Sequence, residues 1–121
     1  MSKILILEDN LERIKKFRTL LFNHDLDVVM HAKDAIDKLK ENKYNLIFLD
    51  HDLNDKQMKW DEDDCGMVVA NFMKDNNINI LTIIHSFNEQ RSKQMEKIIP
   101  KAFYIPGIWL STNSVISNYI E

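Results

Sequence analysis

The sequence predicts an α/β fold in which helices cover both faces of a parallel five-stranded sheet, and three observations support this prediction. Five short apolar runs alternate with five segments of helical periodicity, a pattern typical of consecutive βαβ units. Three of the runs are mostly apolar, as are strands that are buried on both faces of a sheet. The length of 121 residues, with 45% hydrophobic residues, suits a single domain over residues 1–121.

The first half of the chain supplies three strands and two helices. Residues 3–7 form the first strand, and Asn10 is a suitable cap for the helix that follows. A weaker run over 25–30 has polar entry residues, which favours an edge strand, and a helix is expected over 34–42. Residues 45–49 form the third strand. The first helix should bury one apolar face, made of Leu11, Ile14, Phe17, Leu21 and Phe22.

A polar stretch over residues 54–64 follows the third strand and is longer than most connections in α/β proteins. We expect a mobile loop there, whose apolar Met58 and Trp60 either close over a ligand or pack on the surface. A helix over 65–73 and a fourth strand over 78–84 are expected next.

The last third of the chain begins with Ser86 and Glu89, whose S-x-x-E spacing predicts a capping box at the start of a helix. A fifth strand is expected over 102–105, and Ser111 or Thr112 should cap the last helix. This alternation favours the flavodoxin-like strand order 2-1-3-4-5, with the sheet as the middle of three layers.

Acidic residues follow the first and third strands. In the expected order, the switch point of the sheet lies between these strands, so Glu8, Asp9 and Asp50 should meet there. Crowded carboxylates repel one another unless a divalent cation that prefers oxygen lies between them. We therefore predict a Mg²⁺ or Mn²⁺ site with Asp50 as the central ligand. Alternatively, Asp9 and Asp52 are loop acids or helix-start charges, which the helix dipole favours.

Two histidines, His51 and His85, follow neighbouring strands at the same edge. Histidine titrates near neutrality, so these side chains could transfer a proton to or from a phosphate ester, or bind its phosphate. Each could instead be a structural residue. His24 and His31 are expected to be solvated or to cap a secondary-structure element.

A phosphate could also be held by Ser86 and the backbone amides around Asn88, because a helix that begins there presents free N–H groups to an anion. The backbone carbonyl near Asp52 is a possible further ligand of the metal. The capping box alone would equally explain Ser86. Arg13 and Arg91 lie one turn into their helices, where they could reach an anion or form surface salt bridges.

The composition excludes several classes of function. The net charge of −3 gives no support for binding duplex DNA through its phosphates. The only cysteine, Cys65, allows no intrachain disulfide and no cysteine-based zinc site, and we expect it to be a core residue. No signal segment or membrane-length apolar run is present, so we expect a cytoplasmic protein that does not bind a membrane.

With these residues placed, the chain resembles the receiver domain of two-component response regulators over nearly its full length. Glu8, Asp9 and Asp50 match the metal-binding acids and the phosphoacceptor aspartate of that family. Receivers place a lysine at the end of the fifth strand, whereas this chain has Tyr104-Ile105-Pro106-Gly107 there, with Lys101 at the opposite end. The receiver Ser/Thr after the fourth strand is replaced by His85 or shifted to Ser86.

A narrower resemblance rests on Leu-Asp-His-Asp-Leu at 49–53 and His-Ser-Phe-Asn at 85–88, which look like the cyclic-phosphate-processing receiver domains. This resemblance implies a phosphoesterase site that acts on cyclic or terminal phosphates of nucleotides or RNA ends. It implies roles for Asp9, Asp50, His51, Asp52, His85, Ser86 and Asn88.

Three functions remain open from the sequence. The first is a metal-assisted phosphoesterase, in which the cation polarises a phosphoryl oxygen and a histidine is the general acid or base. The second is a single-domain receiver that is phosphorylated on Asp50, and the third is a module that binds a phosphorylated ligand without turnover. The missing lysine and the two added histidines favour the first over the second.

Overall fold

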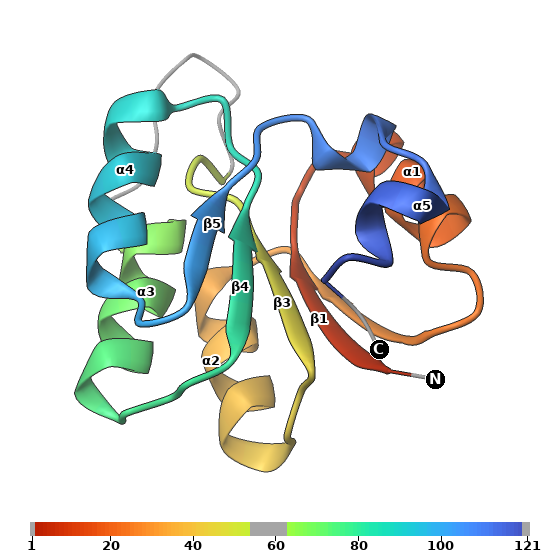
Figure 1. Cartoon of the computed structure of the whole chain (residues 1–121). Helices are drawn as coiled ribbons and strands as arrows, with labels where there is room; N and C mark the ends of the chain where they lie inside the picture. Colours follow the sequence, from red (N-terminus) through yellow and green to blue (C-terminus); the bar gives the residue numbers. More distant parts are fainter. Residues whose placement is uncertain (1, 54–62, 120–121) are drawn as a thin grey trace.

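The structure is a computed structural model that describes residues 2–53 and 63–119 (Figure 1). Five parallel strands form one sheet in the order β2-β1-β3-β4-β5, which confirms the predicted topology. In chain order, the elements are β1 (Lys3–Leu7), α1 (Leu11–Leu20), β2 (Asp25–Val29), α2 (Ala32–Glu41), β3 (Leu46–Leu49), α3 (Gly66–Asp75), β4 (Leu81–Ile84), α4 (Glu89–Ile98), β5 (Ala102–Tyr104), the 3-10 helix η1 (Ile108–Leu110) and α5 (Asn113–Ile116).

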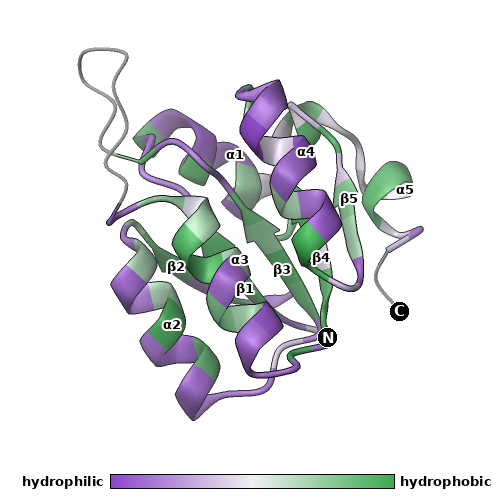
Figure 2. Cartoon of the chain, turned by 90° about the vertical axis from the view of Figure 1, so that its left-hand side faces the viewer, coloured by the Kyte–Doolittle hydropathy of each residue, from purple (hydrophilic) through white to green (hydrophobic). Residues whose placement is uncertain are grey.

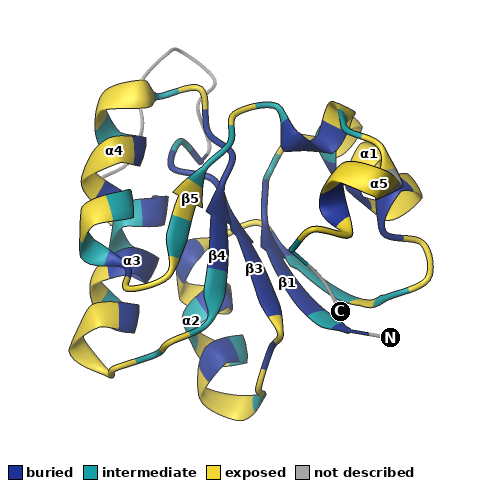
Figure 3. Ribbon diagram, in the orientation of Figure 1, coloured by how far each residue is buried: buried dark blue, intermediate teal, exposed yellow. Residues whose placement is uncertain are grey.

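The helices form two layers, with α2, α3 and α4 on one face of the sheet and α1 and α5 on the other (Figure 1). Successive strand side chains point to opposite faces, so one strand contributes to both layers of the core. In β1, Leu5 and Leu7 belong to the core under α2 to α4, whereas Ile4 and Ile6 belong to the core under α1 and η1. The central strands β1, β3 and β4 are accordingly mostly apolar, and they are buried except at the first residues of β1 and β4 (Figures 2 and 3).

The register of the sheet aligns the carboxyl ends of its central strands. Leu7 pairs with Leu49, and Leu49 pairs with Ile84. The ladder continues one residue further, because the backbone N–H of Asp50 donates to Leu7 (3.2 Å) and that of His85 donates to Leu49 (3.1 Å). The residues directly after β1, β3 and β4 therefore lie side by side, on the face that carries α1.

Several predicted boundaries shift in the structure. Helix α2 begins two residues before the predicted start, at Ala32, and β4 begins at Leu81 rather than at residue 78. Leu11 and Phe22, which were predicted to face the core, are exposed, as is Val115 of α5. Leu11 opens α1 at the edge of the sheet, and Phe22 follows the end of that helix, so neither is held against the core.

The predicted capping box at Ser86 and Glu89 is wrong. Asn88 is the N-cap of α4, and its side chain accepts a hydrogen bond from the backbone N–H of Arg91 at 3.2 Å. Ser86 lies two residues earlier, and its hydroxyl accepts from the N–H of Asn88 at 3.1 Å. Ser86 thus orders the turn into the helix, while Glu89 is the first helical residue.

Residues 54–62, which hold most of the predicted loop together with Met58 and Trp60, lie outside the described part of the chain. Cys65 is buried as predicted, and burial raises the pKa of its thiol. Within residues 2–53 and 63–119, no helix combines the length and apolar composition needed to cross a membrane.

Gly66 allows α3 to begin against the end of β3. Its backbone N–H donates to the carbonyl of His51 at 2.9 Å, and a Cβ on Gly66 would lie 2.2 Å from the carbonyl oxygen of Asp50. This oxygen belongs to the backbone, so a larger side chain forces α3 and the strand end apart.

We therefore expect Gly66→Ala to lower the free energy of unfolding by roughly 1–3 kcal/mol or more, the range for overpacked cores. Chemical denaturation of both proteins measures this change. Gly107→Ala is a matched control, because Gly107 has a φ of +73° but its added Cβ would approach nothing closer than 4.0 Å. A smaller loss at Gly66 than at Gly107 would contradict the close approach.

Candidate functional site

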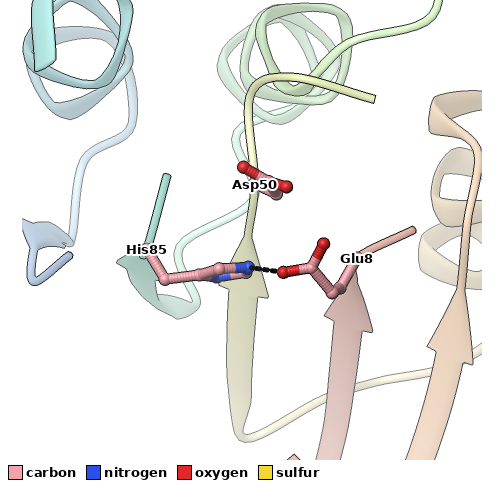
Figure 4. A group of neighbouring side chains, drawn as sticks. All are labelled: Glu8, Asp50 and His85. Carbon is pink, nitrogen blue, oxygen red and sulfur yellow. Dashed lines mark hydrogen bonds and ion pairs between the residues drawn. The ribbon is translucent and has the colours of Figure 1, made fainter. Parts of the chain in front are cut away.

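Three buried side chains meet where β1, β3 and β4 end. Glu8, Asp50 and His85 each offer one potential metal-binding atom, and these atoms lie within 4.8 Å of one another (Figure 4). All three residues are almost completely buried. The sequence produces this cluster through register, because each residue follows the last paired residue of its strand.

Glu8 is the most strongly hydrogen-bonded member of this cluster. Its Oε2 accepts from the backbone N–H groups of Asp9 (2.9 Å) and Asn10 (3.1 Å), and its Oε1 lies 3.3 Å from Nε2 of His85. Burial alone would raise the pKa of Glu8, but the hydrogen bond and charge of His85, the Asn10 N–H and the charge of Arg13 outweigh it. The pKa of Glu8 is thus lowered, and its ionised form is favoured.

Asp50 has the opposite tendency. Burial raises the pKa of its carboxyl group well above the usual value, and the adjacent Glu8 carboxylate raises it further. Arg13 acts against this shift with a nitrogen 4.0 Å from Oδ2 of Asp50. The site therefore holds one ionised carboxylate next to one that favours the protonated form, which is the arrangement that a divalent cation relieves.

The imidazole of His85 lies in an aromatic environment. Its ring centroid is 5.1 Å from that of Phe17 and 5.6 Å from that of Trp109, both in edge-on contacts. Burial lowers the pKa of His85, although Glu8 opposes this effect. An ionised Glu8 accepts only, so Nε2 of the neutral ring carries the proton. Among the described residues, Nδ1 then has no hydrogen-bond partner.

A second polar group connects the end of β3 to the start of α4. Nδ1 of His51 lies 2.6 Å from Oδ1 of Asp52, and the same oxygen accepts from the side-chain amide of Asn88 at 3.1 Å. His51 is fully buried, and burial lowers its pKa, against the effect of Asp52. Two side chains therefore fix the orientation of the Asp52 carboxylate.

These groups border a pocket of about 670 Å³ above the carboxyl ends of the strands. Its described lining is Asp9, Asn10, Leu11, Arg13, Met30, His31, Asp50, Asp52, Ser86 and Phe87. Carboxylates and a hydroxyl line part of the wall, and Leu11, Met30 and Phe87 contribute apolar surface. Ligands of open α/β sheets bind in this location, outside the carboxyl ends of the strands.

Arg13 reaches over the buried cluster from the first turns of α1. One guanidinium nitrogen lies 3.6 Å from Oε1 of Glu8, and the guanidinium carbon lies 4.8 Å from the ring centroid of Trp109 and 5.3 Å from that of Phe87. Arg91, the other candidate, donates to Gln94 on its own helix at 3.1 Å. Arg13 therefore faces the pocket rather than forming a surface salt bridge.

The structure brings the predicted site residues together in two groups. Glu8, Asp50 and His85 form the buried cluster, and His51, Asp52, Ser86 and Asn88 form the polar connection to α4. Asp9 lies in the pocket wall and is not a member of the close cluster. Neither His51 nor His85 belongs to the described lining, so each imidazole lies behind a carboxylate.

The other two histidines lie at element ends, as predicted. Nδ1 of His24 accepts from the N–H of Ser2 at 3.1 Å. His31 lies at the N-cap of α2 without a capping bond of its own, and its Nδ1 is 2.7 Å from Asp64. Asp64 instead accepts from the N–H of Ala32 at 2.8 Å, and it raises the pKa of His31.

Gly66, Phe87 and Trp109 were not among the residues predicted for the site. A glycine in the first turn of a helix is a weak signal for close backbone approach. Phe87 and Trp109 are separated in the chain and meet only in the fold, with ring centroids 5.4 Å apart.

Known structures with the same fold are numerous and distant in sequence. The receiver domain of the Francisella response regulator 1452 superposes with a TM-score of 0.71 and 19% identity, over 98% of this chain and 93% of that chain. The Mn²⁺-bound response regulator Rcp1 gives 0.74 and 17%, over 100% and 96%. TrrA from Thermotoga maritima, in complex with Mg²⁺-BeF, gives 0.70 and 15%, over 99% and 100%.

These similarities establish a receiver fold. A comparison with curated proteins gives no match. The family model described as the cyclic-phosphate processing receiver domain matches residues 4–101, which include all of the buried cluster and the polar connection to α4. The chain therefore belongs to the family of cyclic-phosphate processing receiver domains.

Proposed function

We propose that the chain is a phosphoesterase that uses Mg²⁺ or Mn²⁺ to act on cyclic or terminal phosphates of nucleotides or RNA ends. The observation that carries the proposal is the buried cluster of Glu8, Asp50 and His85, of which Asp50 lines the pocket. Membership of a family associated with cyclic phosphates supports the substrate class.

The residues present fit a divalent cation. Two carboxyl groups lie together in a buried site, and burial together with the adjacent Glu8 carboxylate raises the pKa of Asp50 although Arg13 opposes this shift. Oxygen donors suit Mg²⁺ and Mn²⁺, and Nε2 of His85 would add a nitrogen donor, which Mn²⁺ tolerates better, once its proton has moved to Nδ1. Glu8 and Asp50 would hold the ion, with His85 and the nearby Asp9 as further candidates. The bound ion would stabilise negative charge on a phosphoryl oxygen.

The remaining residues bind the substrate and direct a proton. Ser86 lines the pocket, so its hydroxyl would donate to a phosphate oxygen, and the helix N-terminus of α4 that follows it would favour an anion there. Asp52 would accept a proton from the attacking water or hydroxyl, because it lines the pocket and its orientation is fixed by His51 and Asn88. His51 would hold the Asp52 carboxylate in place through Nδ1 and share the proton that Asp52 accepts.

The alternative of a phosphorylated receiver is less well supported. The chain has no lysine near the end of β5, where residues 104–107 are Tyr-Ile-Pro-Gly. The two histidines His51 and His85 also have no role in accepting a phosphoryl group on Asp50. A module that only binds phosphate would use the same residues, so turnover must be measured.

A turnover screen tests the proposal. We expect the purified chain to open or remove phosphate from nucleoside 2′,3′-cyclic phosphates, 3′,5′-cyclic nucleotides or terminally phosphorylated oligonucleotides when Mg²⁺ or Mn²⁺ is added. Chromatographic detection of the product, with and without a chelator, is the measurement.

Saturable ligand binding without product, at all metal concentrations, would instead support the binding module. A stable mass increase of one phosphoryl group after treatment with acetyl phosphate, absent in Asp50→Asn, would support the receiver function. Either result without turnover contradicts the proposed hydrolysis.

A further inference from the structure

We infer that Arg13 is the phosphate-binding cation of this site and that it binds a phosphoryl oxygen only together with the metal ion. The inference rests on the proposed function, because it assumes that a divalent cation and a phosphate occupy the pocket.

The position of Arg13 is fixed by packing. Its guanidinium lies over the rings of Trp109 (4.8 Å) and Phe87 (5.3 Å), and these rings also contact each other. The side chain is 29% exposed and lines the pocket. Cation–π contacts of this kind orient a guanidinium without using its N–H donors. The donors therefore remain directed at the site.

The charges around Arg13 explain why metal and phosphate should bind together. Its near carboxylate oxygens belong to Glu8 (3.6 Å) and Asp50 (4.0 Å), the same residues that would hold the cation. A metal ion held by these carboxylates would repel the guanidinium and compete with it for their negative charge. A bound phosphate would offset this repulsion, because its negative charge attracts both cations and a guanidinium can donate two parallel hydrogen bonds to phosphate.

The other acidic residues of the pocket disfavour phosphate binding. Asp9 and Asp52 also line the wall, and their carboxylates repel an anion. Phosphate should therefore bind weakly to the metal-free protein, even with Arg13 present. We therefore expect tight phosphate binding only when the metal ion is also bound.

The experiment compares Arg13→Gln with the parent by calorimetry, using Mg²⁺ alone, and then inorganic phosphate with and without Mg²⁺. We expect Arg13→Gln to bind Mg²⁺ as tightly as the parent or more tightly, because a competing cation is lost. Phosphate affinity in Mg²⁺ should fall on the order of 10- to 100-fold, the loss of a charge-assisted hydrogen bond. Arg13→Lys should recover part of this affinity, since it keeps the charge but not the planar pair of donors.

Arg18→Gln is the matched control, because it removes the same charge from an exposed position on the same helix. It should leave both affinities unchanged. Unchanged phosphate affinity in Arg13→Gln overturns the inference and leaves the metal proposal intact. Loss of Mg²⁺ affinity together with phosphate affinity and a lower melting temperature shows a structural role and also overturns it.

If the parent protein does not bind Mg²⁺, the metal proposal fails. The titration with phosphate alone then tests whether Arg13 binds phosphate. A loss of phosphate affinity in Arg13→Gln would then overturn the coupling to the metal and support only phosphate binding by Arg13. Equal affinities, or no binding by the parent, overturn it.

Discussion

Asp50→Asn is expected to abolish phosphate ester turnover and to weaken Mg²⁺ or Mn²⁺ binding severely, while it stabilises the metal-free protein. The loss follows from the position of Asp50 between Glu8 and His85 in the buried cluster. The gain in stability follows from the burial of the Asp50 carboxyl group beside another carboxylate, which raises its pKa. Ionising this group in the folded protein therefore costs free energy. A neutral amide of the same shape does not carry this cost.

The stability that Asp50→Asn gains over the parent should increase with pH. A group whose pKa is higher in the folded state than in the unfolded state stabilises the fold at low pH, and the stabilisation is lost as pH rises through the folded pKa. For Asp50, stability should therefore decline from about pH 4, near the unfolded pKa of aspartate, upward through its raised folded pKa. In Asp50→Asn this part of the decline should be absent.

Thermal melts of the metal-free proteins between pH 4 and pH 8 measure the effect. At pH 7 we expect the variant to be more stable on the order of 1 kcal/mol or more, or a few degrees in the melting temperature. Added Mg²⁺ should raise the melting temperature of the parent and not that of the variant, because only the parent binds the ion. Asp37→Asn, an exposed acid on α2, is the matched control. A variant with parental metal affinity would show that the ion binds elsewhere.

Much of this site is readable from the sequence because its position depends on strand register. Three strands end at the same level, so the residue directly after each one faces its neighbours. The sequence therefore placed Glu8, Asp50 and His85 at one edge of the sheet. It favoured Asp9 over Glu8 as the ligand opposite Asp50, and only the alternation of side chains places Glu8, not Asp9, in the close cluster.

The features of the site that could not be predicted from the sequence depend on contacts between segments that are distant in the chain. Arg13 has the spacing of a surface residue one turn into α1, and its orientation toward the pocket is set by Trp109 and Phe87, which come from two other segments. The capping box failed for a local reason. Ser86 and Asn88 can both cap a helix, and the S-x-x-E pattern does not distinguish a turn before the helix from its first residue.

The last prediction concerns His51, which lies behind a pocket carboxylate rather than in the pocket. His51→Gln should reduce turnover at saturating substrate and metal by a factor on the order of 10²–10⁴, as for a lost proton-transfer group, with little change in affinity. Burial lowers the pKa of His51, so its neutral form is lost only as pH falls below about 6.5. The decline of the parental rate in that acidic range should be altered in the variant.

His51→Asn separates support of Asp52 from proton transfer. An asparagine amide nitrogen lies near the position of Nδ1, which is the atom 2.6 Å from Asp52, whereas a glutamine amide nitrogen lies nearer to that of Nε2. Recovery of turnover in His51→Asn but not in His51→Gln would show that His51 positions Asp52. Failure of both would show that the imidazole itself moves a proton.

His85 and His24 provide the comparison for these variants. His85→Gln should lose stability as well as metal affinity, because its ring packs against Phe17 and Trp109 and contacts Glu8. His24→Gln changes a histidine that contacts Ser2, away from the pocket, and should leave turnover unchanged. If folded His51 variants keep the parental rate and pH profile on every substrate that the parent hydrolyses, the proton path through Asp52 is excluded. Only the cluster around Glu8 and Asp50 then remains to support catalysis.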